Sequence, residues 1–370
     1  MTGPRVALLG TGFMGEFHAR AYATARRTRP SHAASIGLVA DVSEDLARAF
    51  AARWGIARWT TDWLSAAGDP DIDVVDICTP PSAHRELALA ALAAGKHVYC
   101  EKPVGRSHAE TREVAEAARR AGVQTFVGFN YRWFPAVVQA AELIADGFTG
   151  PIRHVRMSFE SDWAADPDVP WAWRMSREQA GHGALGDVGS HMFDMARLLA
   201  GEIESACGQL STFIAERGAG AERRIVDNDD AFDAIVRFAS GATGEFSGSR
   251  VATGSKVEFR VELVGEQGSL RWSVNRLNEL QLFDGRDPES GAGFRTVLMG
   301  PQHPFQGEYS PVQGLGAGFE DSKAIEIAAF LDGLAAGVPV APTFDDAESV
   351  AAILDAVANG QWTTVVGRQE

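Results

Sequence analysis

Cysteine is scarce in this chain of 370 residues. Its three copies, Cys78, Cys100 and Cys207, are widely spaced, and no Cys-x-x-Cys pair occurs. An odd, scattered set of this kind indicates neither a disulfide framework nor a zinc–cysteine site. We therefore expect free thiols in a reducing compartment.

Basic residues are also in short supply, with 34 Lys and Arg against 49 Asp and Glu and a net charge of -15. This balance argues against nucleic acid or an anionic membrane as a partner, because both carry negative charge. It does not exclude a dinucleotide, because glycine backbones and helix ends bind phosphate without a basic patch.

The sequence has no apolar run long enough to span a bilayer, no internal repeat and no low-complexity tract. A strand-like segment begins at Val6, which leaves no room for a signal peptide before it, so we expect a cytoplasmic protein. A length of 370 residues favours two domains, each with its own core.

The most informative pattern that is present is Gly10-Thr11-Gly12-Phe13-Met14-Gly15, between a strand-like run at 6–9 and a helix-like run at 16–22. In that context a G-x-G-x-x-G motif indicates dinucleotide binding. We expect Gly10 to permit a tight turn, Gly12 to admit a pyrophosphate to the backbone, and Gly15 to bring the helix against the strand. The alternative is a glycine-rich turn without a ligand.

Strand-like and helix-like segments alternate through the first 129 residues. Strands are predicted at 6–9, 36–40, 73–79, 97–100 and 123–129, and helices at 16–22, 43–54, 84–94 and 109–121. Ser82 and Ser107 are the candidate caps of the last two helices. The alternation predicts a parallel, doubly wound sheet whose ligands bind at the carboxyl ends of its strands.

Strand-like runs predominate after residue 130. They lie at 152–160, 203–214, 230–238, 242–251, 256–265, 269–272 and 279–283, with helices expected at 135–145, 190–199, 322–336 and 345–359. We predict an α/β protein with a Rossmann domain at 1–129 and an α+β domain at 130–370 built on a large, open, mostly antiparallel sheet. Residues 285–318 are loop-rich and form either a flap or a surface excursion.

Asp41 follows the second predicted strand, where a carboxylate accepts hydrogen bonds from the adenosine ribose and repels a 2′-phosphate. No arginine follows it directly, so the sequence favours NAD over NADP. The alternative is that Asp41 caps the next helix.

Lys102 lies between a glutamate and a proline at the predicted carboxyl edge of the sheet. Its ammonium group could donate to a substrate hydroxyl and favour a developing alkoxide. The alternative is an ordinary solvated surface charge.

Asp187 and His191 are four residues apart near a predicted helix start, with Asp187 at the N-cap or just before it. A histidine oriented by a carboxylate can take a proton from an alcohol near neutral pH. The alternative is a capping aspartate and a packed histidine. Further metal ligands are lacking nearby in the sequence, so we expect no metal.

Four motifs occur in the order and spacing of one known family: Gly10–Gly15, Thr79–His84, Glu101–Pro103 and Asp187–His191. In these motifs the chain resembles the Gfo/Idh/MocA oxidoreductases over essentially its whole length. Within that family, residues 171–174, 180–185 and 316–323 are most similar to the levoglucosan dehydrogenase and inositol dehydrogenase-like branch.

The resemblance implies NAD-dependent oxidation of a secondary hydroxyl on a cyclic polyol or sugar, such as an inositol, an anhydrosugar or a glycoside. Lys102, Asp187 and His191 would form the catalytic set, with His191 as general base while hydride passes to nicotinamide C4. The implied cofactor-binding positions are Gly10, Gly12, Phe13, Met14, Gly15, Asp41, Thr79, Pro80, His84, Glu101 and Asn130. The implied substrate-binding positions are Lys102, Arg132, Trp173, Arg174, His182, Asp187 and His191. The family also implies a homodimer or homotetramer formed through the sheet of the second domain.

One departure from the family pattern is His182, which interrupts a segment that commonly reads Gly-Gly-Gly. It either contacts substrate or is tolerated in a loop. Trp163, Trp171 and Trp173 either stack on a sugar ring or pack in the core.

Two other functions stay open beside the dehydrogenase. Transient oxidation of a ring carbon would permit elimination of a glycoside, as in an NAD-assisted glycosidase. A non-catalytic NAD-binding protein is the third hypothesis, and the presence of Lys102, Asp187 and His191 together counts against it.

Overall fold

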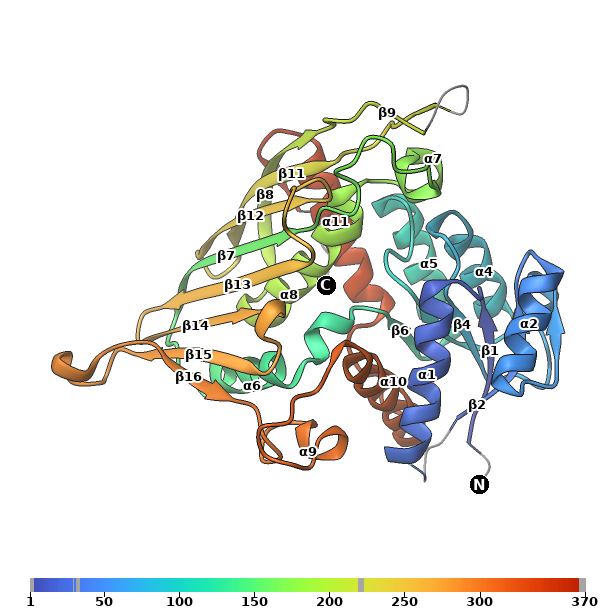
Figure 1. Cartoon of the computed structure of the whole chain (residues 1–370), viewed down its shortest axis with the longest axis horizontal. Helices are drawn as coiled ribbons and strands as arrows, with labels where there is room; N and C mark the ends of the chain where they lie inside the picture. The colour runs from blue at the N-terminus through green and yellow to red at the C-terminus, as the bar shows by residue number, and fades with distance from the viewer. Residues whose placement is uncertain (1–2, 29, 31–33, 219–222, 366–370) are drawn as a thin grey trace. The chain divides into compact units, whose positions relative to one another are not determined.

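A computed structural model describes residues 3–28, 30, 34–218 and 223–365 of the chain (Figure 1). Two compact units are distinguished by their internal contacts. The first unit comprises Met1–Asn130 and Phe319–Glu348, and the second comprises Tyr131–Gly318 and Ser349–Glu370. This grouping differs from the predicted division at residue 129 in placing Phe319–Glu348 with the N-terminal segment.

The first unit contains a six-stranded parallel sheet in the order β3-β2-β1-β4-β5-β6. Its strands are β1 (Arg5–Leu9), β2 (Ser35–Ala40), β3 (Trp59–Thr60), β4 (Val74–Ile77), β5 (His97–Cys100) and β6 (Thr125–Val127). All four residues of β4 are buried, as expected for a strand that is covered on both faces. The strand order reverses between β1 and β4, which is where sheets of this class bind ligands.

Helices connect and cover these strands (Figure 1). They are α1 (Phe13–Thr28), α2 (Glu44–Trp54), α3 (Trp63–Ala67), α4 (Pro81–Ala93), α5 (His108–Ala121) and α10 (Phe319–Ala336). The Ser107 hydroxyl caps α5 as predicted, by accepting the Glu110 N–H at 3.3 Å. The cap predicted at Ser82 is wrong, because α4 already begins at Pro81, whose missing N–H and fixed φ suit the first helical position.

The second unit is built on a nine-stranded sheet in the order β16-β15-β14-β13-β7-β12-β11-β8-β17. Its strands are β7 (Ile152–Glu160), β8 (Ile203–Ser211), β11 (Ala231–Phe238), β12 (Thr243–Ser249), β13 (Glu258–Gly265), β14 (Gly268–Ser273), β15 (Glu279–Asp284), β16 (Arg295–Leu298) and β17 (Thr363–Thr364). Every neighbouring pair is antiparallel except β7 and β12. The predicted α/β class, with a parallel sheet and a mostly antiparallel sheet, is confirmed.

One face of this sheet is apolar and the other is exposed. Along β11, buried residues such as Phe232 and Val236 alternate with the exposed Asp233, Ile235 and Arg237. This period of two is that of a strand with one face on a core and one face open. The longer helices of the second unit are α6 (Pro135–Ala145) and α8 (Ser190–Ala200), and α11 (Phe344–Ala358) runs across the boundary between the units.

The sequence missed several short elements. The stretch 285–318 contains β16 and the one-turn helix α9 (Gln306–Tyr309), and a separate two-stranded sheet pairs β9 (Glu216–Arg217) with β10 (Arg224–Ile225). Two- to four-residue elements carry too little periodicity to be seen in a sequence. Among the residues described, no helix combines the length and the apolar character that crossing a lipid bilayer requires.

Candidate active site

The glycine-rich loop joins β1 to α1 in the first unit. Gly10 has φ 101°, and a Cβ on it would lie 2.8 Å from the Cys78 carbonyl group at the end of β4. A Cβ on Gly15 would lie 2.1 Å from the Gly10 carbonyl oxygen. A Cβ on Gly12 would meet nothing within 4 Å. The loop therefore has a tight turn, close packing of helix on strand, and an open approach at Gly12, which fits a dinucleotide pyrophosphate at the start of α1.

Asp41 is fixed beside this loop. Its Oδ2 accepts hydrogen bonds from the Thr11 N–H at 3.0 Å and the Thr11 hydroxyl at 2.6 Å, and its Oδ1 accepts the Ser43 N–H at 3.0 Å. The cap of α2 is Ser43, whose hydroxyl accepts the Leu46 N–H. Asp41 therefore ties the loop to the end of β2, and its contact with a ribose stays a prediction.

The predicted cofactor residues that follow β4 are linked to those that follow β5. His84 is buried, with Nδ1 2.7 Å from the Pro103 carbonyl oxygen and Nε2 2.7 Å from the Thr79 carbonyl oxygen. The ring thus holds the Thr79–Pro80 turn against the Lys102–Pro103 turn. Asn130, after β6, is also buried, and its side-chain amide lies 3.4 Å from the Ser322 hydroxyl.

The carboxylate of Glu101 is buried in the interior of the first unit. It accepts hydrogen bonds from His18 Nε2 at 2.9 Å, Lys323 Nζ at 2.8 Å and the Lys102 N–H at 3.3 Å. Although burial opposes ionisation, the nearby Lys323 and His18 hold the pKa of Glu101 well below its usual range. Glu101 therefore fixes the backbone of Lys102, whose own side chain is half-buried.

A buried row of charges continues from Glu101 in both directions. On one side, His18 Nδ1 lies 2.8 Å from Asp76, and this carboxylate raises the pKa of His18 to about 9 although burial lowers it. On the other side, Lys323 Nζ lies 2.6 Å from Glu326, whose pKa burial raises to about 7. Sequence patterns did not predict this row of charges. The one signal of it is Asp76, which stands among the apolar residues of 74–77, since a buried charge needs a partner.

One group of potential metal ligands occurs among the described residues. Ligand atoms of His18, Asp76 and Cys78 lie within 4.8 Å of one another. Both nitrogens of His18 face carboxylates, however, which favours the imidazolium form, and an imidazolium has no lone pair for a metal. The geometry is that of an ion-pair network.

In the second unit, Asp187 and His191 lie at the start of α8. A π turn, Leu185–Gly189, precedes α8, and the Asp187 N–H donates to the Gly183 carbonyl at 2.9 Å. The expectation that Asp187 is the N-cap or lies just before it is therefore wrong, because Asp187 is already inside the helical run. The sequence could not foresee this, since the groups that cap the run come from elsewhere in the chain.

Tyr131 contacts His191 and lies close enough to Asp187 to be affected by its charge. Its ring meets the His191 ring edge-on, with centroids 4.7 Å apart and planes at 74°. Burial and the negative charge of Asp187 both raise the pKa of the Tyr131 hydroxyl. The structure thus gathers Asp187, Tyr131 and His191 in the second unit. Lys102 belongs to the first unit, so the three-residue catalytic set stays a prediction.

Arg132 forms a buried, bidentate ion pair with Asp194 of α8. Arg132 Nε donates at 2.9 Å to one carboxylate oxygen, and Nη2 donates to the other. Asp194 lies one helical turn beyond His191, so the pair fixes the part of α8 that carries the histidine. Contact of Arg132 with substrate stays a prediction.

The tryptophans of residues 163–173 differ in their surroundings. The Arg174 guanidinium lies 4.3 Å from the ring centroid of Trp173, and that of Arg224 lies 3.8 Å from the ring of Trp171. Trp163 is 38% exposed. Two of the three rings therefore have an arginine over one face, and Trp163 offers the more accessible surface.

His182 is half-buried and lies between two glycines, and the structure requires a glycine at each of these two positions for a different reason. Gly181 has φ 74° and ends the short helix α7 (Arg177–Ala180), while a Cβ on Gly183 would lie 1.9 Å from the Asp229 carbonyl oxygen. His182 Nε2 lies 3.3 Å from Asp355 Oδ1. Neither glycine constraint applies at position 182, which explains how a histidine fits there. Its contact with substrate stays a prediction.

Two protein-family models match the chain. One, described as "Oxidoreductase family, NAD-binding Rossmann fold", covers residues 4–129, and the other, "GFO/IDH/MocA C-terminal domain", covers residues 137–271. The chain belongs to the Gfo/Idh/MocA family of oxidoreductases. The resemblance inferred from four short motifs is therefore confirmed, and so is NAD as the cofactor of this Gfo/Idh/MocA protein.

Relatives within the Gfo/Idh/MocA family match along nearly the whole chain. Levoglucosan dehydrogenase from Pseudarthrobacter phenanthrenivorans is 38% identical over 380 aligned residues, with 97% of each chain covered. Inositol 2-dehydrogenase from Rhizobium meliloti is 28% identical, with 95% of each chain covered. A solved structure of levoglucosan dehydrogenase in complex with NADH and levoglucosan is similar with a TM-score of 0.96 and 38% identity, covering 99% of this chain and 100% of the other.

Proposed function

We propose that this protein is an NAD-dependent dehydrogenase that oxidises a secondary hydroxyl of a cyclic polyol or sugar. The observation that carries the proposal is the grouping of Asp187, from the π turn before α8, and His191, from α8, with Tyr131, from the turn after β6. This grouping combines a histidine with a nearby carboxylate, in a chain that is similar from end to end to dehydrogenases named for an anhydrosugar and an inositol.

His191 serves as the general base in this proposal. Bound NAD supplies the hydride acceptor, nicotinamide C4. A histidine suits the removal of a hydroxyl proton, because its usual pKa lies near neutral pH. Asp187 orients the imidazole or a sugar hydroxyl, and the Tyr131 ring restricts the imidazole to one plane.

Lys102 acts on the oxygen from which the proton is removed. Its ammonium group donates a hydrogen bond that strengthens as negative charge develops on that oxygen. Its backbone N–H is held by Glu101, and the following turn is held by His84. These contacts preorganise Lys102 before a substrate arrives.

The substrate class follows from the relatives, and the residues that select among its members lie in the second unit. We propose anhydrosugars first and inositols second, in the order of their similarity to this chain. The accessible ring of Trp163 offers an apolar surface for the C–H face of a sugar, with Trp173, Arg174, Arg132 and His182 as the further predicted contacts.

The test is a survey of NADH formation with levoglucosan, inositols, aldoses and glycosides, using wild-type protein and the Lys102→Ala and His191→Ala variants. We expect at least one cyclic polyol to be oxidised, and both variants to lose about 100-fold or more in kcat. Unchanged turnover in both variants would overturn the proposed roles. Glycoside cleavage without net NADH would identify the glycosidase, and NAD binding without any turnover would identify the non-catalytic protein.

We also propose that the exposed face of the nine-stranded sheet forms a homodimer or homotetramer. A ladder of paired charges crosses this face, with Arg156 3.5 Å from both Glu245 and Glu262, and Arg271 2.6 Å from Glu262. The exposed Ile235 adds an apolar contact on the neighbouring β11. A two-fold axis brings a face against a copy of itself, and a face that carries both signs of charge and an apolar residue suits such an interface.

A further inference from the structure

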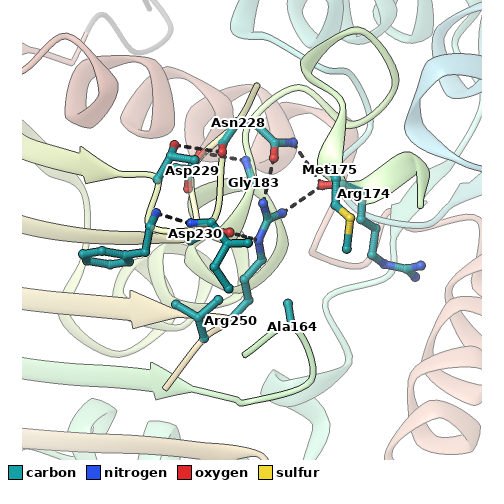
Figure 2. Close-up of polar contacts among 12 residues, drawn as sticks. Ala164, Arg174, Met175, Gly183, Asn228, Asp229, Asp230 and Arg250 are labelled. Carbon is teal, nitrogen blue, oxygen red and sulfur yellow. Dashed lines mark hydrogen bonds and ion pairs between the residues drawn. The ribbon is translucent and has the colours of Figure 1, made fainter. Parts of the chain in front are cut away.

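Asp229 receives three consecutive backbone N–H groups from the start of the helical run that carries Asp187 and His191. Its Oδ1 accepts the Gly183 N–H at 2.7 Å, its Oδ2 accepts the Leu185 N–H at 2.7 Å, and its backbone carbonyl accepts the Ala184 N–H at 2.9 Å. Asp229 is buried, and Figure 2 shows it against Gly183.

These contacts make Asp229 the cap of that run. The first N–H groups of a helix have no acceptor within the helix, and the helix dipole favours a negative charge beside them. Ala184 stands at the cap position and makes no side-chain cap of its own. Asp229, 44 residues after Leu185, supplies the acceptors instead, and a glycine at 183 permits the close approach. The position of Asp187 and His191 is therefore set by the position of Asp229.

Asn228 and Asp230, on either side of Asp229, both bind Arg250 and through it contact the backbone at Arg174. Asp230 Oδ1 accepts Arg250 Nε at 2.9 Å, and Asn228 Oδ1 accepts Arg250 Nη2 at 2.9 Å. Both Arg250 Nη1 and Asn228 Nδ2 donate to the carbonyl oxygen of Arg174, at 2.9 and 3.0 Å (Figure 2). The backbone after Trp173 is thus held by two donors.

Arg217 holds the other end of the tryptophan-containing segment, residues 163–174, through backbone carbonyl groups. This guanidinium is fully buried and donates to the carbonyl oxygens of Ala164 and Asp166. It lies 3.7 Å from Asp230, which therefore faces two buried arginines. Buried guanidinium groups are costly unless a carboxylate compensates them, so Asp230 keeps both arginines in place.

We propose that Asn228, Asp229 and Asp230 are the positioning residues of the substrate side of this enzyme. Asp229 sets the turn that carries Asp187 and His191. Asn228 and Asp230, through Arg250 and Arg217, set the backbone of residues 163–174. The inference rests on the proposed function for what these two segments do with a substrate. Three adjacent residues thereby fix the position of the turn that carries Asp187 relative to that of residues 163–174.

Two variants separate the two effects in steady-state kinetics with NAD and the best polyol of the survey. Asp229→Asn removes the charge and turns an N–H donor toward the capped amides, so we expect kcat to fall about 10-fold or more while KM changes less than about threefold. Arg250→Lys loses the forked contact with Asn228 and Arg174, so we expect KM to rise about 10-fold with a smaller change in kcat. NAD affinity stays unchanged in both.

Asp284→Asn is the matched control, because it also removes a carboxylate that accepts a backbone N–H, that of Arg286, in the second unit. We expect its kcat and KM to match the wild type. If Asp229→Asn and Arg250→Lys leave both constants unchanged, or if both variants lower kcat alone by the same factor, the division of roles is wrong.

Amide hydrogen exchange tests the positioning independently of catalysis. We expect Asp229→Asn to speed exchange in residues 183–191 and Arg250→Lys to speed it in residues 163–174, each leaving the other segment protected. Uniformly faster exchange in either variant would overturn the proposal. If the wild type oxidises no polyol, the proposed function fails while this measurement still decides the positioning. Asp229→Ser, which keeps one acceptor, replaces Asp229→Asn if that variant does not fold.

Discussion

Several residues of this protein are buried charges, and each is compensated by an opposite charge or by backbone N–H groups. Glu101 is adjacent in sequence to Lys102, yet its carboxylate binds His18 and Lys323 in the interior of the first unit. A buried carboxylate of this kind is stable only with its cations in place. The motif residue Glu101 therefore links the Lys102 turn to a buried ion-pair row.

The contribution of Lys323 to stability is a first prediction at this scale. We expect Lys323→Met to lower the free energy of unfolding by about 3–5 kcal/mol, because it leaves buried carboxylates without their cation. Lys256→Met is the control, since Lys256 also pairs with a carboxylate, Asp162, but is 86% exposed. Its loss should cost less than about 1 kcal/mol. Chemical denaturation measures both, and equal effects would contradict the buried role.

A second prediction concerns the pH dependence of stability. The pKa of His18 is about 9 in the folded protein and 6.5 in a free side chain, so folding favours the protonated ring. Its stabilising contribution is complete below pH 6.5 and is lost as the pH rises through 9, by about 3 kcal/mol in total. The raised pKa of Glu326, about 7, adds a loss of stability as the pH rises from about 4.5 to 7.

His18→Gln provides the comparison for this pH effect. Urea unfolding between pH 8 and 9 should show a falling free energy for the wild type and a nearly flat one for His18→Gln. Glu326, with a pKa of about 7, has largely titrated below this window in both proteins. The same slope in the variant would show that His18 is not the titrating group.

At the scale of elements, the turns between strands and helices determine where the chemistry can occur. The β1–α1 loop combines two glycines that the fold requires, Gly10 and Gly15, with one that it does not, Gly12. The helical run that leads into α8 depends for its cap on Asp229, two residues before β11, rather than on its own sequence. In both places the geometry of one element is completed by another.

The loop yields a prediction that separates folding from cofactor binding. Gly12→Ala meets no protein atom within 4 Å, so we expect the free energy of unfolding to change by less than about 1 kcal/mol while the Kd for NAD rises about 10-fold. Gly15→Ala would place its methyl group 2.1 Å from a backbone oxygen, so we expect it to destabilise the fold. Thermal unfolding and NAD titration measure both variants. Normal NAD affinity in Gly12→Ala would contradict the proposed pyrophosphate approach.

At the scale of the whole molecule, the open face of the nine-stranded sheet is a surface to which the proposed function gives no role in catalysis. Ile235 is 54% exposed there, between charged residues of β11. We predict that Ile235→Arg converts the proposed oligomer to single chains, since it places a buried charge in the proposed interface. Light scattering after size-exclusion chromatography measures the mass. Val338→Arg, at an equally exposed apolar residue of the first unit, is the control and should leave the mass unchanged.

The sequence by itself determined the order of the main elements, the glycine-rich cofactor loop and the family. These features are local: apolar periodicity, helix caps such as Ser107, and glycines at fixed spacing can all be read within a few residues. The same reasoning placed Lys102, Asp187 and His191 in named roles, which await the activity survey.

The tertiary structure alone decided which charged groups meet. The pairing of Asp76 with His18, and of Lys323 with Glu101, joins residues that are 58 and 222 positions apart. Two further contacts are equally non-local: Asp229 caps the turn that carries Asp187, and Arg250 donates to the Arg174 carbonyl oxygen. The partner of a buried charge is set by how distant segments pack, and a single sequence records that such a charge needs a partner without recording which residue supplies it.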